Sequence, residues 1–255
     1  MKRRDFAKLS AAAAASAALP AAAQTAAPQT IDDFQRPDSF YAGHGWHSLN
    51  PGYWEIKGNA LRRRIHTRGD RGRKTGFPYH AYMATEYEVL PPYGMIWRRD
   101  WKLEKNFTIS AELTVHEAPR KQPEPGYSLG GVAFGGRTLY ESWNFKAERG
   151  DAAWFAAWRD DGRFGVYDHA NEEPVNRLAE KAGPMPKAGD KAVIEVALSG
   201  SSGSMGTIDA KLLVNGSEAA AIHLENFDRS DYTNGYFGLV GRGWLDFDVN
   251  RVSLD

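Results

Sequence analysis

Nearly every periodic segment of this chain alternates apolar and polar residues, and this alternation limits the folds open to it. In residues 107–116 (FTISAELTVH) every second side chain is apolar, and residues 192–199 and 208–214 repeat the pattern. Side chains of a β-strand point alternately to opposite faces of the sheet, so each segment has one buried face and one solvated face. The pattern predicts strands of antiparallel sheets.

Turn residues divide these segments into hairpins. Asn215-Gly216 follows the third alternating segment, and this dipeptide favours a tight turn because both positions need positive φ. Further hairpins are predicted around Asp160-Asp161-Gly162 and Lys57-Gly58-Asn59. Helical signals after the first 23 residues are scarce, and residues 174–182 are the segment that favours a turn or two of helix. Many strands with Gly and Asn turns predict an all-β, two-sheet antiparallel sandwich.

The first 23 residues have the pattern of an export signal. Lys2, Arg3 and Arg4 precede a short alanine-rich stretch, and Ala21-Ala22-Ala23 offers a small-residue cleavage site. The segment is too short to span a membrane, which takes about 20 apolar residues. The stretch RRDFAK at residues 3–8 resembles the twin-arginine signal, with Lys2 and Ala7 departing from its pattern. The resemblance implies a partner in the twin-arginine export machinery and a periplasmic or secreted protein.

The composition agrees with export in the folded state. The chain has no cysteine, and a protein that folds in the reducing cytoplasm gains nothing from disulfides. Removing residues 1–23 takes away four of the 32 basic residues and one of the 32 acidic ones, which leaves a net charge of −3. That balance argues against a nucleic-acid partner. Residues 24–30 are predicted to be a short tether and residues 31–255 a single domain.

The order of several segments resembles the exported concanavalin A-like (laminin G-like) jelly-roll domains of bacteria. The segments are IDDFQRPDSF, YWEIKGNALRR, NFTISAEL, SLGGVAFGG, AVIEVAL, KLLVNG and the closing NGYFGLVGRGWLDFDVNRVSL. The resemblance covers most of residues 31–255. It implies two curved antiparallel sheets, a concave face that holds glycans in relatives, and first and last strands that lie side by side. Structural calcium is common at that seam, so Asp33 and Asp248 are the predicted metal ligands.

Two enzyme families share this sandwich, and the sequence fits them to different degrees. Glucanase-type enzymes carry two carboxylates on one face of a strand, but Glu141 and Glu148 are an odd number of residues apart and so face opposite sides. The 3-keto-disaccharide hydrolase-like domains share the WEIKGNAL-type opening and the Gly-rich strand. Their Asn-Ser-Gly segment is only loosely matched by residues 127–131. This family is kept as an alternative without transfer of catalytic residues.

Aromatic and basic residues cluster in two stretches that suit saccharides. Sugar rings stack on indoles, and Arg forks bind hydroxyls and acidic groups. Residues 61–74 (LRRRIHTRGDRGRK) carry a dense basic group, and MIWRRDW at residues 95–101 sets two tryptophans around an arginine pair. Trp54, Trp154 and Trp158 lie in alternating strands and are predicted to be core. The predicted ligand-binding residues are Trp97, Trp101, Arg98, Arg99, Trp46, Trp143, Tyr82 and Arg64.

Proton-transfer candidates are less well defined by the sequence. His80, His169 and Glu141 rank first, because they lie beside aromatic residues or at the predicted end of a strand. The sequence therefore predicts an exported carbohydrate-active protein with a Trp- and Arg-lined cleft, which acts as a glycan hydrolase or lyase on a neutral or acidic saccharide. A non-catalytic, lectin-like glycan binder remains open beside it.

Overall fold

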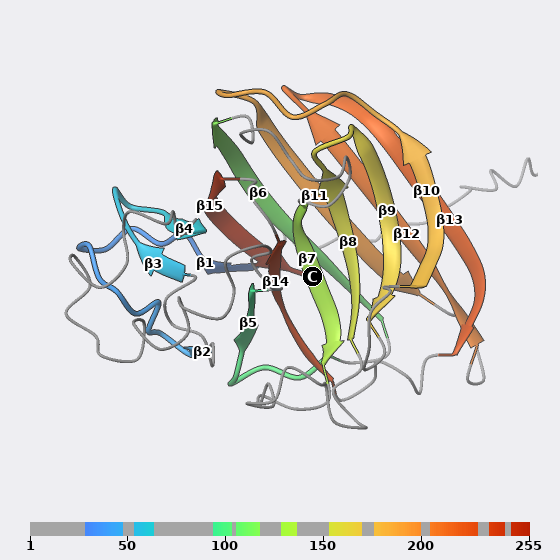
Figure 1. Ribbon diagram of the computed structural model, residues 1–255. Helices are drawn as coiled ribbons and strands as arrows, with labels where there is room; N and C mark the ends of the chain where they lie inside the picture. Colours follow the sequence, from blue (N-terminus) through green and yellow to red (C-terminus); the bar gives the residue numbers. More distant parts are fainter. Residues whose placement is uncertain are drawn as a thin grey trace, which may run out of the picture.

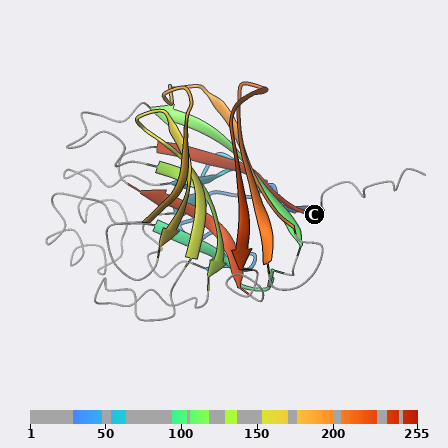
Figure 2. The ribbon, with the colours of Figure 1, turned by 90° about the vertical axis from the view of Figure 1, so that its right-hand side faces the viewer.

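The computed structural model describes residues 29–47, 54–63, 94–103, 106–117, 129–136, 153–169, 176–199, 205–228, 235–242 and 246–255. Their strands form two antiparallel sheets that pack face to face (Figure 1). Figure 2 looks onto the edge where β10 and β13 lie in separate layers. The predicted all-β jelly-roll sandwich is confirmed. None of the described residues belongs to a helix long and apolar enough to cross a membrane.

The eight-stranded sheet contains the first and the last strand of the chain. Its order is β13-β12-β11-β6-β15-β4-β3, with β1 also pairing β15. The strands are β1 (Gln29–Asp32), β3 (Trp54–Ile56), β4 (Leu61–Arg63), β6 (Phe107–Glu117), β11 (Lys191–Ser199), β12 (Met205–Val214), β13 (Ser217–Asp228) and β15 (Asp246–Leu254).

The seven-stranded sheet has the order β10-β9-β8-β7-β14-β5-β2. Its strands are β2 (Trp46–His47), β5 (Gly94–Arg98), β7 (Leu129–Gly136), β8 (Ala153–Arg159), β9 (Arg163–His169), β10 (Asn176–Ala182) and β14 (Tyr236–Arg242). This sheet is buried on both faces. One face packs on the eight-stranded sheet, and the other carries a separate apolar cluster that includes Met95, Trp97, Phe155 and Tyr167.

The alternation seen in the sequence matches the burial of the strands. In β11 the side chains alternate between exposed or half-buried and buried along the whole strand. The turns also follow the prediction: Asn215 and Gly216 have φ of 51° and 82°, and Gly58 and Asn59 have φ of 60° and 61°. Glycine and asparagine tolerate this left-handed conformation, which lets two strands reverse in a few residues.

Aromatic rings and branched aliphatic side chains fill the space between the sheets. Trp54 and Trp158 are each 1% exposed and Trp154 is 9% exposed, so the prediction that these three tryptophans are core is confirmed. Trp54 meets Phe247 edge-on with the ring centroids 6.0 Å apart. Gly130 lies where a methyl group would come within 2.5 Å of the Phe247 ring, so the glycine leaves room for this pair.

The prediction of a short helix at residues 174–182 is wrong. Asn176–Ala182 is strand β10, which pairs antiparallel with β9 through a bulge between Arg177 and Ala179. The bulge breaks the strict alternation of the strand. A segment with polar residues at irregular spacing looks helical in the sequence, although pairing with β9 determines its conformation.

Candidate functional site

Trp46 and the predicted ligand-binding residues of strand β5, Trp97 and Arg98, lie side by side in the structure. Strand β2 pairs with β5 at one edge of the seven-stranded sheet, with Trp46 opposite Arg98 and His47 opposite Trp97. The backbone N–H of Arg99 also donates to the carbonyl oxygen of Gly45 at 2.8 Å. The residues that the sequence singled out at positions 46 and 97–101 thus form one cluster.

Trp46 and Arg98 lie on the inner side of this cluster. Trp46 is 6% exposed and donates its indole Nε1–H to Asp32 Oδ2 at 2.9 Å. The Arg98 guanidinium lies 5.8 Å from the centroid of the Trp46 ring and binds both carboxylate oxygens of Asp100, at 2.6 and 3.0 Å. These hydrogen bonds hold the pKa of Asp100 below its usual range. Trp46 and Arg98 therefore stabilise the cluster from the side that faces the core.

The opposite side of the cluster belongs to the outer face of the seven-stranded sheet. Trp97 lies across Gly136, where an added methyl group would come within 2.8 Å of the ring. His47 is half-buried beside it, while Arg99 is exposed and Trp101 is half-buried. Burial and, second, the positive charge of Arg99 lower the pKa of His47. The imidazole is therefore neutral at pH 7, where it can accept a proton.

On this outer face, cross-strand neighbours from six strands form continuous rows. Two cross-strand rows follow from the pairing registers, and both have glycine or alanine on the central strands and larger side chains toward the ends. Small side chains lie between large ones on this face, and the large ones cover them in part, since an added methyl group at Gly165 would come within 2.4 Å of the Tyr167 hydroxyl. The first row is His47, Trp97, Gly238, Ala133, Phe155 and Tyr167, and the second is Met95, Val240, Gly131, Ala157, Gly165 and Glu180.

Aromatic rings lie on both sides of the small residues, and Phe155 and Tyr167 form the wall beside β10. On one side Lys102 places its Nζ 3.1 Å from the centroid of the half-buried Tyr236 ring, close to Trp97 along the sheet. On the other side Phe155 and Tyr167 stack, with centroids 5.2 Å apart and an interplanar angle of 26°. The small residues and Trp97 are buried, whereas Lys102 and Arg99 are exposed. A ligand on this face would meet the exposed rim.

A hydrogen-bonded network closes the wall next to β10. Glu180, whose side chain is 7% exposed, accepts from Arg159 at 2.5 Å, from Arg163 at 3.0 Å and from the Tyr167 hydroxyl at 2.9 Å. Arg159 also donates to Asp161 at 3.0 Å. Burial, together with the charge of Glu180, raises the pKa of Tyr167 above its usual value, so the phenol stays protonated as a donor. The network positions the wall and leaves Tyr167 unsuited to act as a base near pH 7.

The raised pKa of Tyr167 predicts a loss of stability at alkaline pH. The unfolded chain releases this proton near pH 10, while the folded chain keeps it, so folding is disfavoured as pH rises above 10. The free energy of unfolding should fall by up to about 1.4 kcal/mol per pH unit relative to the Tyr167→Phe variant. Urea unfolding of both proteins from pH 8 to 11 measures this difference. Parallel curves for the two proteins would contradict the prediction.

Several predicted site residues cannot be placed. His80, Glu141, Trp143, Tyr82 and Arg64 lie outside the described residues, as does most of the basic stretch 61–74. His169 ends β9, where its backbone pairs with Ala153. From the basic stretch, Arg62 binds Asp248 and Arg63 is buried with its guanidinium 5.9 Å from the centroid of the Trp54 ring. These two arginines therefore serve packing and ion pairing.

The two predicted calcium ligands lie in different surroundings. Asp33 is exposed and accepts from the backbone N–H of Gln35 at 3.2 Å. Asp248 is 8% exposed and binds Arg62 at 2.8 and 3.1 Å and His116 at 2.5 Å. Strand β1 does pair with β15, but Asp32 stands opposite Val252. No group of three or more His, Asp or Glu side chains that could hold a metal occurs among the described residues.

Neither the Glu180 network nor the small residues of the outer face are predicted by the sequence. Glu180 lies in the segment predicted as helical, and Arg159 and Tyr167 were read only as parts of a hairpin. A usable signal is the repeated small–aromatic pattern of AWFAAWR in β8, where alanines face both sides of the strand. Such a pattern indicates a face on which something packs closely against the backbone.

Comparison with known proteins supports the fold. No family model matches the chain, and no curated protein matches it significantly. The alginate lyase Aly36B is similar over 89% of this chain and 96% of that chain, at 10% identity and a TM-score of 0.50. The metal-free Emp46p carbohydrate recognition domain is similar over 88% and 94%, at 9% identity and 0.50. The Ca²⁺/Man3GlcNAc-bound VIP36 exoplasmic/lumenal domain is similar over 89% of both chains, at 13% identity and 0.51.

Proposed function

We propose that this chain is an exported carbohydrate-active protein that binds an oligo- or polysaccharide at the exposed rim formed by Arg99 and Lys102, beside the outer face of its seven-stranded sheet. The observation that carries the proposal is the exposed pair Arg99 and Lys102 beside the outer face, where Lys102 Nζ lies 3.1 Å from the centroid of the half-buried Tyr236 ring and Arg99 lies near His47. A saccharide can stack on an aromatic ring while charged groups beside the ring bind its polar groups. The proposal includes the twin-arginine leader at residues 1–23, which delivers the folded protein to the periplasm or the exterior.

The rim favours an acidic saccharide. Arg99 and Lys102 are both exposed beside His47 and Tyr236, and the nearest carboxylate, Asp100, is engaged by Arg98. Guanidinium and ammonium groups beside an aromatic ring can bind a carboxylate or sulfate while the ring stacks on the sugar. The predicted contact residue Arg99 fits this rim, whereas Trp101 packs against the core between the sheets.

The structural neighbours support a glycan as the ligand. One is named an alginate lyase and two are lectin-type domains, one of them solved with Ca²⁺ and a mannose-containing oligosaccharide. Both an enzyme and non-catalytic binders thus use this sandwich. A structural calcium, with Asp33 and Asp248 as ligands, stays a prediction for this chain.

Within this proposal, lyase chemistry is the catalytic form that the rim favours. In such an elimination a base removes the C5 proton next to a uronate carboxylate while a cation neutralises that carboxylate. A C4–C5 double bond forms, the C4–O glycosidic bond breaks, and the leaving oxygen takes a proton from water. His47 is neutral near pH 7 and Arg99 is close enough to influence its charge, so the two could fill these roles. His80, His169 and Glu141 stay alternative proton-transfer residues. A lectin-like binder is the second candidate, because Arg159, Tyr167 and Glu180 are hydrogen-bonded to one another and so are not free for proton transfer.

A polyuronate, a sulfated glycan and a neutral glycan, each titrated into the protein by calorimetry, test the proposal. The Arg99→Ala/Lys102→Ala variant should bind the acidic glycans at least tenfold more weakly, since each lost charged contact is worth roughly 1 kcal/mol or more. Lys57→Ala, in an exposed turn on the other sheet, is the matched control. The rim would be refuted as the site if the double variant bound every glycan as tightly as the wild type. It would also be refuted if the wild type bound none of them.

Product formation separates the enzyme from the binder. Uronate elimination leaves an unsaturated end that absorbs in the near ultraviolet, so the polyuronate mixture is followed by absorbance. If the protein is a lyase that uses His47, the His47→Asn variant should lose at least a hundredfold in kcat with little change in affinity. Binding without product assigns the lectin-like function.

A further inference from the structure

The sandwich ends in strands that differ in how well they are protected. A strand at the edge of a sheet offers unpaired backbone groups to other chains, and proteins guard such edges with short strands, bulges, lysine or proline. Among the described edge strands, β1, β2 and β3 have two to four residues, and Ser39 bridges to β3 at Ile56. Strand β10 has a bulge and carries Lys181. Strand β13 has twelve residues and contains neither lysine nor proline.

The middle of β13 is regular. Its pairing with β12 shifts register near each end, and between the shifts Ala220–Leu224 runs in unbroken register. Ala220 and Ile222 face the core at 8% and 4% exposure, while Ala221 and His223 are exposed on the outer face. The described residues pair β13 only with β12, so its other edge points away from the sheet.

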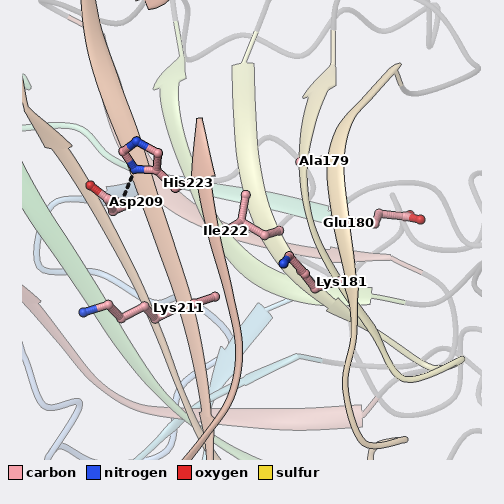
Figure 3. A pocket seen from close by; sticks show the side chains of 8 residues that line it. Ala179, Glu180, Lys181, Asp209, Lys211, Ile222 and His223 are labelled. Carbon is pink, nitrogen blue, oxygen red and sulfur yellow. Dashed lines mark hydrogen bonds and ion pairs between the residues drawn. The ribbon is translucent and has the colours of Figure 1, made fainter. Parts of the chain in front are cut away.

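A pocket of about 310 Å³ lies along this edge (Figure 3). Its lining includes side chains from both faces of β13, which shows that the pocket reaches around the free edge of the strand. Figure 3 also shows Lys181 of β10 pointing toward Ile222, with the Asp209–His223 pair on the other side of β13. The lining residues are Ala179, Glu180, Lys181, Asp209, Lys211, Ala221, Ile222 and His223.

We propose that β13 pairs antiparallel with β13 of a second copy of this chain, with Ile222 opposite Ile222 across a two-fold axis. A strand that extends the eight-stranded sheet must place apolar residues on the core side and polar residues outside, in step with β13. The regular stretch of β13 meets that requirement itself, because Ala220 and Ile222 alternate with Ala221 and His223. The two-fold symmetric contact is closed, so it yields a dimer rather than a filament.

Side-chain packing and the avoidance of like charges favour this register. His223 stands opposite Ala221 of the second copy, and the next strands bring Asp209 beside His223 and Lys211 beside Ala221. Each row across the junction thus reads Asp209, His223, Ala221, Lys211, with the acidic and basic ends on different copies. A shift by two residues in one direction would set His223 against His223, and like charges directly opposite destabilise a sheet. A shift by two in the other direction would set Ile222 against Ala220 and lose the contact between the two isoleucines. A shift by one would turn Ile222 to solvent.

Lys181 does not block the junction. Its ammonium has no ion-pair partner in the described part of the chain, and it is exposed on a long flexible stem. Its stem can therefore turn away from the edge of β13 when a second strand pairs there.

Disulfide trapping tests the register, because the chain has no cysteine of its own. Residues directly opposite in an antiparallel pair have Cα atoms about 4.5–5.5 Å apart, within the disulfide range, whereas diagonal neighbours are about 7–8 Å apart. Mixing the Ala221→Cys and His223→Cys variants under mild oxidation should give at least tenfold more covalent dimer than either variant alone. Equal cross-linking in the single variants, or none in the mixture, overturns the proposal.

Sedimentation velocity over a range of protein concentrations tests for the dimer without engineered disulfides. Ala221→Lys places a cation opposite His223 and next to Lys211, and should raise the dimer dissociation constant at least tenfold. Because Ala221 is exposed, the monomer fold is retained, which circular dichroism checks. Ala188→Lys, in the exposed turn before β11, should leave the dissociation constant unchanged. A wild-type chain that stays monomeric, or an Ala221→Lys variant that dimerises as the wild type does, overturns the proposal.

Discussion

Replacing Asp32 by alanine should lower the free energy of unfolding by about 3–5 kcal/mol, the range for removing one partner of a buried ion pair. Its side chain is 6% exposed and binds Arg36 at 2.7 and 3.0 Å. It also accepts from the Trp46 indole at 2.9 Å and from the backbone N–H of Phe34 at 2.8 Å. The variant leaves a half-buried guanidinium and two buried N–H groups without their acceptor.

Asp33→Ala is the matched control for Asp32→Ala. Asp33 is exposed, so its loss should change the free energy of unfolding by no more than about 0.5 kcal/mol. For a chain of this size the Asp32 variant should melt roughly 6–20 °C below the control. Calorimetry of both proteins with and without calcium also examines the proposed metal site, because a rise in melting temperature with calcium that Asp32→Ala keeps and Asp33→Ala loses would mark the Asp33 carboxylate as a ligand. Equal melting of the two variants would contradict the structural role of Asp32.

The strands and tight turns of this fold could be predicted because their causes are local. Alternation in β6, β11 and β12 decides which side chains are buried, and Asn215-Gly216 reverses the chain in two residues. The hairpin of β8 and β9 follows from the same signals, with Gly162 at a φ of 82°. Even the neighbouring positions of the first and last strands came from the family resemblance, and the pairing of β1 with β15 confirms it.

The candidate site was less predictable because it depends on pairing between distant segments. The sequence identified Trp46, and separately Trp97 with Arg99, but only the pairing of β2 with β5 places the two groups together and brings His47 beside them. It could not tell that Trp46 turns inward to Asp32 while His47 turns outward, since a two-residue strand has no alternation to read. Glu180 was missed for a different reason: a bulge in β10 hides the strand, and its three donors come from β8 and β9.

Glu180→Ala should destabilise the protein by about 3–5 kcal/mol, because the variant leaves Arg159 with a buried and partly uncompensated charge. The Arg159 side chain is 19% exposed and keeps only Asp161 as an ion-pair partner among the described residues. Tyr167 also loses its acceptor while it stays stacked on Phe155 at 4% exposure. Guanidinium-induced unfolding followed by tryptophan fluorescence measures the change.

Glu112→Ala provides the comparison that isolates burial as the cause. Glu112 is 44% exposed and binds Arg251 at 3.4 Å on the outer face of the eight-stranded sheet, so its loss should cost less than about 1 kcal/mol. The same chemical change then differs severalfold in effect between the two sheets. If Glu180→Ala were as mild as Glu112→Ala, the Arg159 network would not support the wall beside β10. The proposed saccharide face would then have to be held in shape by the aromatic stack of Phe155 and Tyr167 alone, since that stack is what remains of the wall without the carboxylate.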